Sequence, residues 1–298
     1  MERLEEAYVQ NESMRQKASS LFSFERQVFD IFAISAVAVL LFLVTKTHTS
    51  FQNQLVLFYD NPAPHAFYTT HFVHESAAHL RGNLISYLVV VPLTYLISLR
   101  AGRHREFRLG FLAILFVLPP IISLVSLLGL DLVIQTIFGF DPNVRSSRGF
   151  SALAGAFVGM LMVAVADLFR DIADREGSLW PVIGLMFWYG IAVAFWGVFQ
   201  YLVSLLTVLL VLLPTAYAVW LVKKVEGQYN IVDGMQAGGW LRGRPVTVGL
   251  LGVGFFATVW GTQGLLAFPW FEGGTNTLSH FVGILSGISL MIFSRPLV

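Results

Sequence analysis

The sequence predicts an all-α, polytopic membrane protein that folds as one helical bundle. Apolar residues make up 56% of the 298-residue chain and charged residues only 12%, whereas charged residues in soluble domains run near ~25%. Several apolar runs reach the roughly 20 residues that a helix needs to cross a bilayer. No cysteine is present, which excludes disulfides, thiolate metal sites and a cysteine nucleophile.

The chain divides into a short N-terminal segment and a membrane domain. Residues 1–27 mix both signs of charge and lack the apolar core and small-residue cleavage site of a signal peptide, so we interpret them as a cytosolic segment. The membrane domain is expected over residues 28–294. The apolar run from Pro181 to Val222 would be about 60 Å long as one helix, so it must fold back near Gln200 and Tyr201. Eight spans are therefore predicted, at 28–45, 78–99, 109–130, 149–169, 180–200, 202–222, 246–269 and 277–294.

The distribution of positive charge predicts the orientation of these spans. Cytoplasmic connections carry an excess of Lys and Arg, and most of the 19 Lys and Arg residues fall in the connections on the same side as the N-terminus. Eight spans with both termini in the cytoplasm fit this pattern. The formal net charge of +1, without a basic stripe, predicts no nucleic-acid partner.

Polar residues gather where three of the predicted spans begin. Such residues are costly inside a membrane and are functional candidates by default. They are His74, His79 and Asn83 at the second span, Gly149 and Ser151 at the fourth, and His280, Gly283 and Gly287 at the last. By the charge distribution all three spans run from outside to inside. The three clusters are therefore expected to lie near the same, outer leaflet.

The residue types in these clusters predict nucleophilic catalysis. A serine hydroxyl needs a neighbouring base, and His280 is the only histidine in the C-terminal half of the chain, so Ser151 and His280 form the expected pair. His79 and Asn83 are four residues apart and share a helix face, where both could donate to an oxyanion. No Asp or Glu near the outer ends completes a triad, which favours a Ser–His dyad.

Small residues predict that the serine helix and the last helix approach closely. Gly155 and Gly159 stand four residues apart on the serine helix, and Gly283 and Gly287 follow His280 on the same face of the last helix. Spacings of this kind let membrane helices pack backbone to backbone. Close packing would bring the hydroxyl of Ser151 within reach of the His280 imidazole.

At these positions the chain resembles the rhomboid family of intramembrane serine proteases. The family has His-x4-His-x3-Asn on its second helix, Gly-x-Ser-Gly on its serine helix, and Ala-His-x2-Gly-x3-Gly on its last helix. The chain departs from it at Ala152 and Ser279, in place of a glycine and an alanine, and its loop 46–76 has neither Trp nor Arg. The resemblance implies a rhomboid-like core, here with an inserted helix pair within 180–245. It also implies a dyad of Ser151 and His280, with Gly149 beside the serine.

The resemblance further implies that His79 and Asn83 join the oxyanion hole and that His74 supports the site. The expected function is a serine endopeptidase that hydrolyses a peptide bond in or near the transmembrane segment of another membrane protein. Its partners would be the lipid bilayer and a membrane-protein substrate whose transmembrane helix unwinds easily. The expected location is the cell membrane, and no cofactor is implied.

Three other interpretations remain open. A rhomboid-like pseudoprotease would bind transmembrane helices without cutting them, and Ala152 or the inserted pair could have disabled its site. A transporter or channel would need a polar pathway, and the spans within 180–222 offer almost none. A metal site is suggested by histidines crowded in one segment, His65, His71, His74 and His79. His74 and His79 are five residues apart, however, and diverge around a helix, so no metal is expected.

Overall fold

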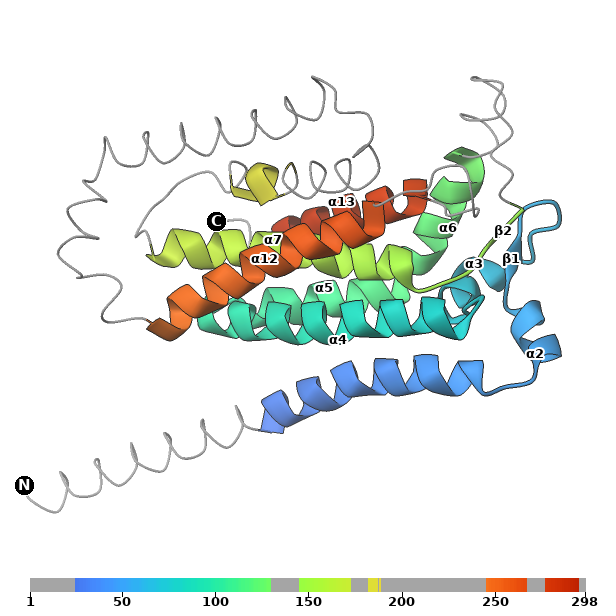
Figure 1. The fold of residues 1–298 in the computed structure, drawn as a ribbon, viewed down its shortest axis with the longest axis horizontal. Helices are drawn as coiled ribbons and strands as arrows, with labels where there is room; N and C mark the ends of the chain where they lie inside the picture. The colour runs from blue at the N-terminus through green and yellow to red at the C-terminus, as the bar shows by residue number, and fades with distance from the viewer. Residues whose placement is uncertain are drawn as a thin grey trace, which may run out of the picture.

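The computed structural model describes residues 25–129, 145–172, 182–186, 188, 245–266 and 277–294. Over these ranges the regular secondary structure is helical except for one pair of two-residue strands, so the predicted all-α class is confirmed. The long helices are the first helix (Glu25–Thr45), α4 (Ala77–Arg100), α5 (His104–Phe116), α6 (Leu118–Leu128), α7 (Ser151–Ile172), α12 (Pro245–Leu266) and α13 (Thr277–Phe293), as Figure 1 shows. The short helices are α2 (Thr49–Gln54), α3 (Ala66–Thr69) and a 3₁₀ turn over Thr70–Phe72.

The lengths and composition of these helices make the chain a multi-pass membrane protein. Within the described ranges, the first helix, α4, α7 and α12 are long and apolar enough to cross a membrane, and α5 with α6 forms a bent candidate for a fifth span. The last helix, α13, is apolar but has only 17 residues. The predicted span 202–222 lies outside the described residues, as do most of 180–200 and of the inserted pair within 180–245. The count of eight spans stays a prediction.

The third predicted span, 109–130, is wrong as a single helix. The structure has two helices, α5 and α6, whose axes are bent by 52° at Val117. The cause is in the sequence, where Pro119 and Pro120 open α6. A proline ring has no amide hydrogen and clashes with the preceding turn, so it is tolerated at the start of a helix but not in its interior.

Helix α7 lies at the centre of the bundle. Within its membrane-length window 94% of the residues are buried, compared with 50% for α4 and 33% for α12. Helices α4, α12 and α13 pack around it, and α13 makes the most extensive contact. At the far end of α7, Asp167 is buried and its Oδ1 lies 3.6 Å from Arg170 Nη2, the pairing expected from their spacing. The serine helix is thus the element that the rest of the bundle encloses.

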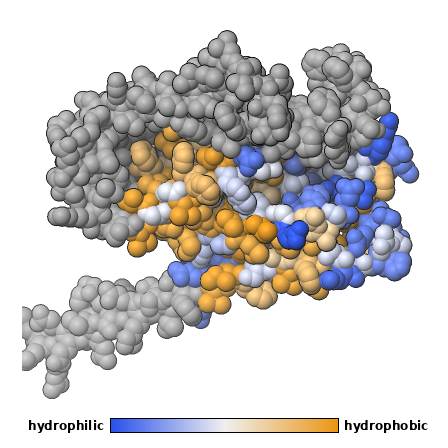
Figure 2. All heavy atoms as spheres, viewed as in Figure 1, coloured by the Kyte–Doolittle hydropathy of each residue, from blue (hydrophilic) through white to orange (hydrophobic). Residues whose placement is uncertain are grey.

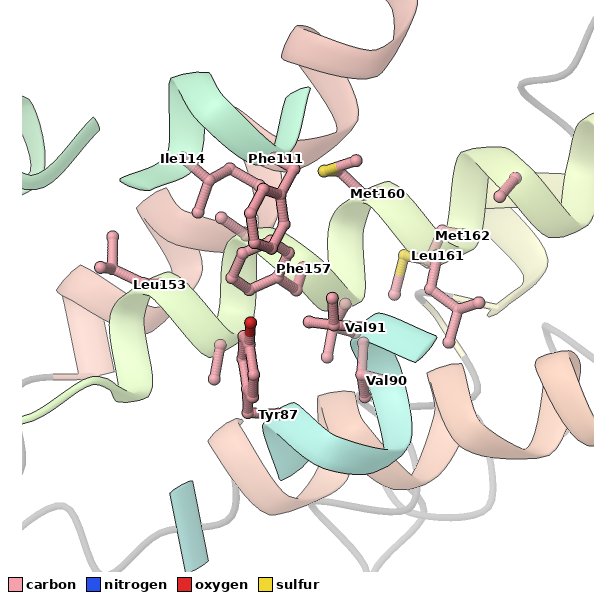
Figure 3. Packing of buried hydrophobic residues seen from close by; sticks show 14 of the residues in the cluster. Tyr87, Val90, Val91, Phe111, Ile114, Leu153, Phe157, Met160, Leu161 and Met162 are labelled. Carbon is pink, nitrogen blue, oxygen red and sulfur yellow. The ribbon is translucent and has the colours of Figure 1, made fainter. Parts of the chain in front are cut away.

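An aromatic cluster fixes α4 and α5 against α7. The ring of Phe157 on α7 lies 5.6 Å from that of Tyr87 on α4 and 5.7 Å from that of Phe111 on α5 (Figure 3). Offset and edge-to-face arrangements at such separations add to the benefit of burial. The Tyr87 hydroxyl donates to Ile34 O at 2.8 Å, which satisfies its polar end and ties the first helix to α4.

The first helix is attached to the bundle on one side only. In its membrane-length window 22% of the residues are buried, and Phe29 and Phe32 are largely exposed. Near its start, the buried Asp30 carboxylate accepts two hydrogen bonds from the Arg108 guanidinium of α5, from Nε and from Nη2, both at 2.8 Å. This bidentate pair and the Tyr87 contact hold the helix in place.

Polar surface gathers at the end of the bundle where α4 and α7 begin (Figure 2). There the loop after the first helix carries strand β1 (Leu57–Phe58), which pairs antiparallel with β2 (Ser146–Ser147), just before α7. Tyr59 N also donates to Arg145 O at 3.1 Å. The first loop is therefore bonded to the segment that leads into the serine helix. We call residues 145–150 the lead segment.

Candidate functional site

The structure brings Ser151 and His280 into hydrogen-bond contact. Ser151 is the first residue of α7, and His280 lies one turn into α13. The Ser151 Oγ and His280 Nε2 atoms are 2.7 Å apart, and the imidazole is buried. This separation is within the range at which a base can take the proton of a serine hydroxyl.

The other nitrogen of His280 fixes which atom carries the proton. His280 Nδ1 lies 2.7 Å from Leu265 O, in the last turn of α12. A carbonyl oxygen can only accept, so Nδ1 carries the hydrogen and donates to it. In the neutral imidazole Nε2 is then unprotonated and accepts from the Ser151 hydroxyl. The imidazole is in the tautomer that general-base catalysis by Nε2 requires.

Glycines allow α7 and α13 to lie close enough for this contact. A Cβ added at Gly283 or Gly287 would collide with backbone oxygens of α7, those of Ala152 and Ala156. A Cβ at Gly155 would lie 2.9 Å from His280 O, and one at Gly159 would collide with Ile284 O. All four glycines expected to pack these helices lie in their interface. Gly155 faces His280 and Gly159 faces Ile284, so residue numbers increase in the same direction along both helices and the two helices run parallel.

Gly149 lies directly under the His79 ring. Its φ of +122° lies in the region that favours glycine, and an added Cβ would be 2.6 Å from His79 Cε1. His79 is held near the start of α4, where its backbone N–H donates to the N-cap Ser76 Oγ at 3.1 Å. The His79 side chain is thereby brought beside the residues that precede Ser151.

His74 supports the backbone immediately before the serine. Its Nε2 accepts from the Phe150 N–H at 3.4 Å, and its ring packs edge-on against that of His79 with centroids 5.3 Å apart. Burial, and then the nearby His79, lower the pKa of His74 to about 4. His74 is therefore neutral at neutral pH, as an acceptor for Phe150 N must be.

Asn83 is a buried amide whose Nδ2 has no hydrogen-bond partner in the part of the chain that the structure describes. It is only 6% exposed. Asn83 follows His79 by one helical turn, so both side chains project from the same face of α4. An unpaired buried donor costs stability. Such a group at this position is suited to an acceptor that arrives with a substrate.

Thr70 holds the lead segment in place, and the sequence analysis did not single it out. It is fully buried in the 3₁₀ turn, and its hydroxyl accepts from Leu57 N at 3.1 Å and donates to Ser147 O. Its own carbonyl accepts from Gly149 N at 3.0 Å. Thr70 thus joins β1, β2 and the glycine beside the site. A threonine in a loop between two apolar runs carries no signal of these contacts.

The histidines of the first loop have structural partners. His65 Nε2 lies 2.8 Å from Gln54 O, and His71 Nε2 lies 3.0 Å from both Pro119 O and Ser123 Oγ, which joins the loop to α6. Burial lowers the pKa of His71 to about 4. In the part of the chain that the structure describes, no three His, Asp or Glu side chains are placed to share a metal ion.

No protein-family model, curated protein or solved structure matches this chain. The site and the fold are therefore interpreted from their own geometry.

Proposed function

We propose that the chain is a rhomboid-like intramembrane serine endopeptidase. The observation that carries this proposal is the 2.7 Å contact between Ser151 Oγ and His280 Nε2, together with the Nδ1–H tautomer that Leu265 O imposes. The buried His280 and the partly exposed Ser151 lie at one end of a membrane bundle, which supports a substrate that is itself in the membrane. The excess of Lys and Arg on the opposite side supports an outward-facing site in the cell membrane, with both termini cytoplasmic.

In the proposed reaction Ser151 Oγ attacks the carbonyl carbon of a peptide bond while His280 Nε2 takes the hydroxyl proton. The tetrahedral intermediate collapses when the imidazolium gives that proton to the leaving amine, which leaves an acyl group on Ser151. Water then attacks the acyl-enzyme, with His280 again acting as the base, and releases the new carboxylate.

The residues around Gly149 would stabilise the negative oxygen of the intermediate. The Nδ2 of Asn83 is a donor without a partner among the described residues, and the His79 ring lies over Gly149, two residues before the nucleophile. The N–H groups in the first turn of α7 have no intrahelical acceptor and add donors at the same place. Donors held in position before the reaction stabilise developing charge without reorganisation.

The substrate class follows from the location of the site. A substrate that comes from the bilayer must present a free backbone carbonyl to Ser151. In an intact transmembrane helix the carbonyls are engaged in the helix's own hydrogen bonds. The proposed partner is therefore a membrane protein whose transmembrane segment unwinds easily near the cleaved bond.

Cleavage of a reporter membrane helix by the purified protein in detergent tests the proposal. Wild type is expected to cut, and Ser151→Ala and His280→Ala to lose at least about 10³-fold in kcat/KM. Ser289→Ala is the matched control, because among the described residues the Ser289 hydroxyl bonds within its own helix, α13, with Oγ donating to Leu285 O at 2.9 Å. It should cut like wild type.

Labelling by a fluorophosphonate separates the proposal from its main rival. Wild type and Ser289→Ala should be labelled, and Ser151→Ala should not. A folded wild type that neither cuts any of several reporters nor reacts with the probe would instead be a binder of transmembrane helices. Equal cutting by Ser151→Ala would show that the active site lies elsewhere.

A further inference from the structure

The carbonyl of Leu265 occupies the place that a carboxylate has in a Ser–His–Asp triad. Its oxygen is 2.7 Å from His280 Nδ1, on the side of the ring opposite Ser151. Leu265 lies in the last turn of α12, where carbonyl groups lack an intrahelical partner. The C-terminal end of a helix also carries partial negative charge, which favours a cation nearby. The carbonyl is thus suited to orient the imidazole and to stabilise the imidazolium.

The position of this carbonyl depends on how α12 packs against α7. Two glycines bring the helices together, since an added Cβ at Gly261 would lie 2.7 Å from Val158 Cγ2, and one at Gly254 would lie 2.6 Å from Val165 Cγ2. Gly254, Gly261 and Leu265 are separated by seven and four residues and so share one face of α12. Contact along this face sets where the last turn ends.

Near the start of α12, the buried Thr247 Oγ1 accepts from Arg100 Nε of α4 at 3.0 Å, whereas the two buried hydroxyls nearer its C-terminal end bond within the helix. Thr258 Oγ1 donates to Phe255 O, and Thr262 Oγ1 donates to Thr258 O, both at 2.7 Å and both within α12. Its other face is largely exposed, at Val253 and Phe256 for example. Thr247 lies about five turns before Leu265, so near the last turn it is the fit of the glycine face on α7 that sets the position of Leu265 O.

We propose that α12 is a positioning element for the base: Leu265 O orients His280, and the packing of Gly261 on α7 holds Leu265 O in place. This inference rests on the proposed function, because the orientation of His280 matters to catalysis only if His280 is the base. Leu265 is here a positioning residue that acts through its backbone. Its contribution should appear in kcat, with little change in KM, because it contacts the base and not the substrate.

Replacing one backbone amide by an ester tests the carbonyl without changing any side chain. An ester in place of the Leu265–Leu266 amide weakens Leu265 O as an acceptor and removes one helix N–H. An ester in place of the Gln263–Gly264 amide removes one helix N–H equally, at a glycine where an added Cβ would meet no described residue within 4 Å. The first ester should lower kcat on the reporter about tenfold with KM unchanged, and the second less than twofold. Equal effects of the two esters would overturn the proposal.

Nitrogen NMR of ¹⁵N-labelled histidine, with His280→Ala for assignment, distinguishes failure of this inference from failure of the proposed function. Wild type should show the Nδ1–H tautomer of His280, and the ester after Leu265 should reduce its share. If the ester shifts the tautomer but wild type cleaves no reporter, the contact between Leu265 O and His280 stands and the proposed protease function is wrong. An Nε2–H tautomer of His280 in wild type would contradict the proposal that Leu265 O orients His280.

A pair of side-chain variants tests the packing of α12. Gly261→Ala should displace the helix from Val158 and lower kcat about tenfold. The Cβ of Gly264→Ala would meet no described residue within 4 Å, so this variant should leave kcat unchanged. Thermal unfolding of both variants shows whether each is folded. If Gly261→Ala is not folded, the comparison of the two esters tests the proposal instead. Equal kcat values for the two folded variants would contradict the role of this packing.

Discussion

Asn83 is buried, and its Nδ2 has no hydrogen-bond partner among the described residues. Its replacement should therefore affect activity and stability differently. We expect Asn83→Leu to lower kcat on the reporter about 10²- to 10³-fold, the usual cost of one oxyanion donor. We also expect it to leave the thermal unfolding temperature unchanged or to raise it, because a buried Nδ2 without a partner among the described residues is removed.

Ser126 on α6 provides a control for the Asn83 variant. Its Oγ is also buried without a partner in the described part of the chain. Ser126→Ala should therefore be as stable as wild type or more stable, with full activity. Loss of stability in Asn83→Leu that matches its loss of activity would mean that Asn83 serves the fold and not the reaction.

At the same scale, the sequence predicts some contacts of the site and misses others. Ser151, His280 and Asn83 are polar residues in apolar spans, so each is visible against its surroundings. Leu265 contacts His280 through its backbone carbonyl, and Thr70 bonds its neighbours through a hydroxyl in a loop. A leucine in an apolar helix and a threonine in a loop are both common, so neither residue type draws attention. A polar residue in an apolar span can be recognised from the sequence, whereas the contacts of a backbone carbonyl or of a loop hydroxyl depend on the fold.

Among the helices, the glycines of α7 and α13 differ from glycines elsewhere in what surrounds them. An added Cβ at Gly287 would collide with Ala156 O of the facing backbone, whereas Gly82 on α4 has nothing within 4 Å. Gly287→Ala should lower the free energy of unfolding by about 2 kcal/mol, a typical cost of overpacking. Gly82→Ala should raise it by up to about 1 kcal/mol, because alanine is the better helix former.

Thermal unfolding in detergent, followed together with cleavage, measures both glycine variants. Gly287→Ala should also lose activity, because moving α13 away from α7 separates Ser151 from His280. Similar stability of the two variants would mean that α7 and α13 can separate at no cost, contrary to the close approach described above.

Element boundaries show what apolar patterning can and cannot predict. The second predicted span, 78–99, matches α4 (Ala77–Arg100), and the last, 277–294, matches α13 (Thr277–Phe293). The third, 109–130, is a bent pair of helices and not one helix, because hydropathy predicts the length of an apolar segment and not the bend that Pro119 and Pro120 introduce. The strands β1 and β2 are two residues long, too short to form any alternating pattern.

For the whole molecule, the pair formed by Asp30 and Arg108 governs how the first helix is attached. Asp30 is buried, whereas about a third of the Arg108 side chain is exposed. Arg108→Gln leaves the buried Asp30 carboxylate without its compensating charge and should lower the free energy of unfolding by about 3 kcal/mol or more. Asp30→Asn leaves an arginine that can turn toward water and should cost less.

Proteolysis of the region around the first helix, compared with global unfolding, shows whether the first helix detaches alone. Arg108→Gln should increase cleavage there before the rest of the bundle unfolds. The double variant, Asp30→Asn with Arg108→Gln, should recover much of the loss, because no uncompensated charge remains. Equal stability of the two single variants would contradict the difference in burial between the two side chains.

The hydrogen bonds of the first loop have a mechanical consequence. Strand β1 is bonded to β2, and Thr70 to Ser147 and Gly149, so the chain after the first helix and the chain before Ser151 form one tether. A displacement of the first helix along the membrane normal pulls on this tether at β1 and transmits tension to the lead segment. Bilayer thickness, which sets the depth of that helix, is thereby connected to the position of Ser151.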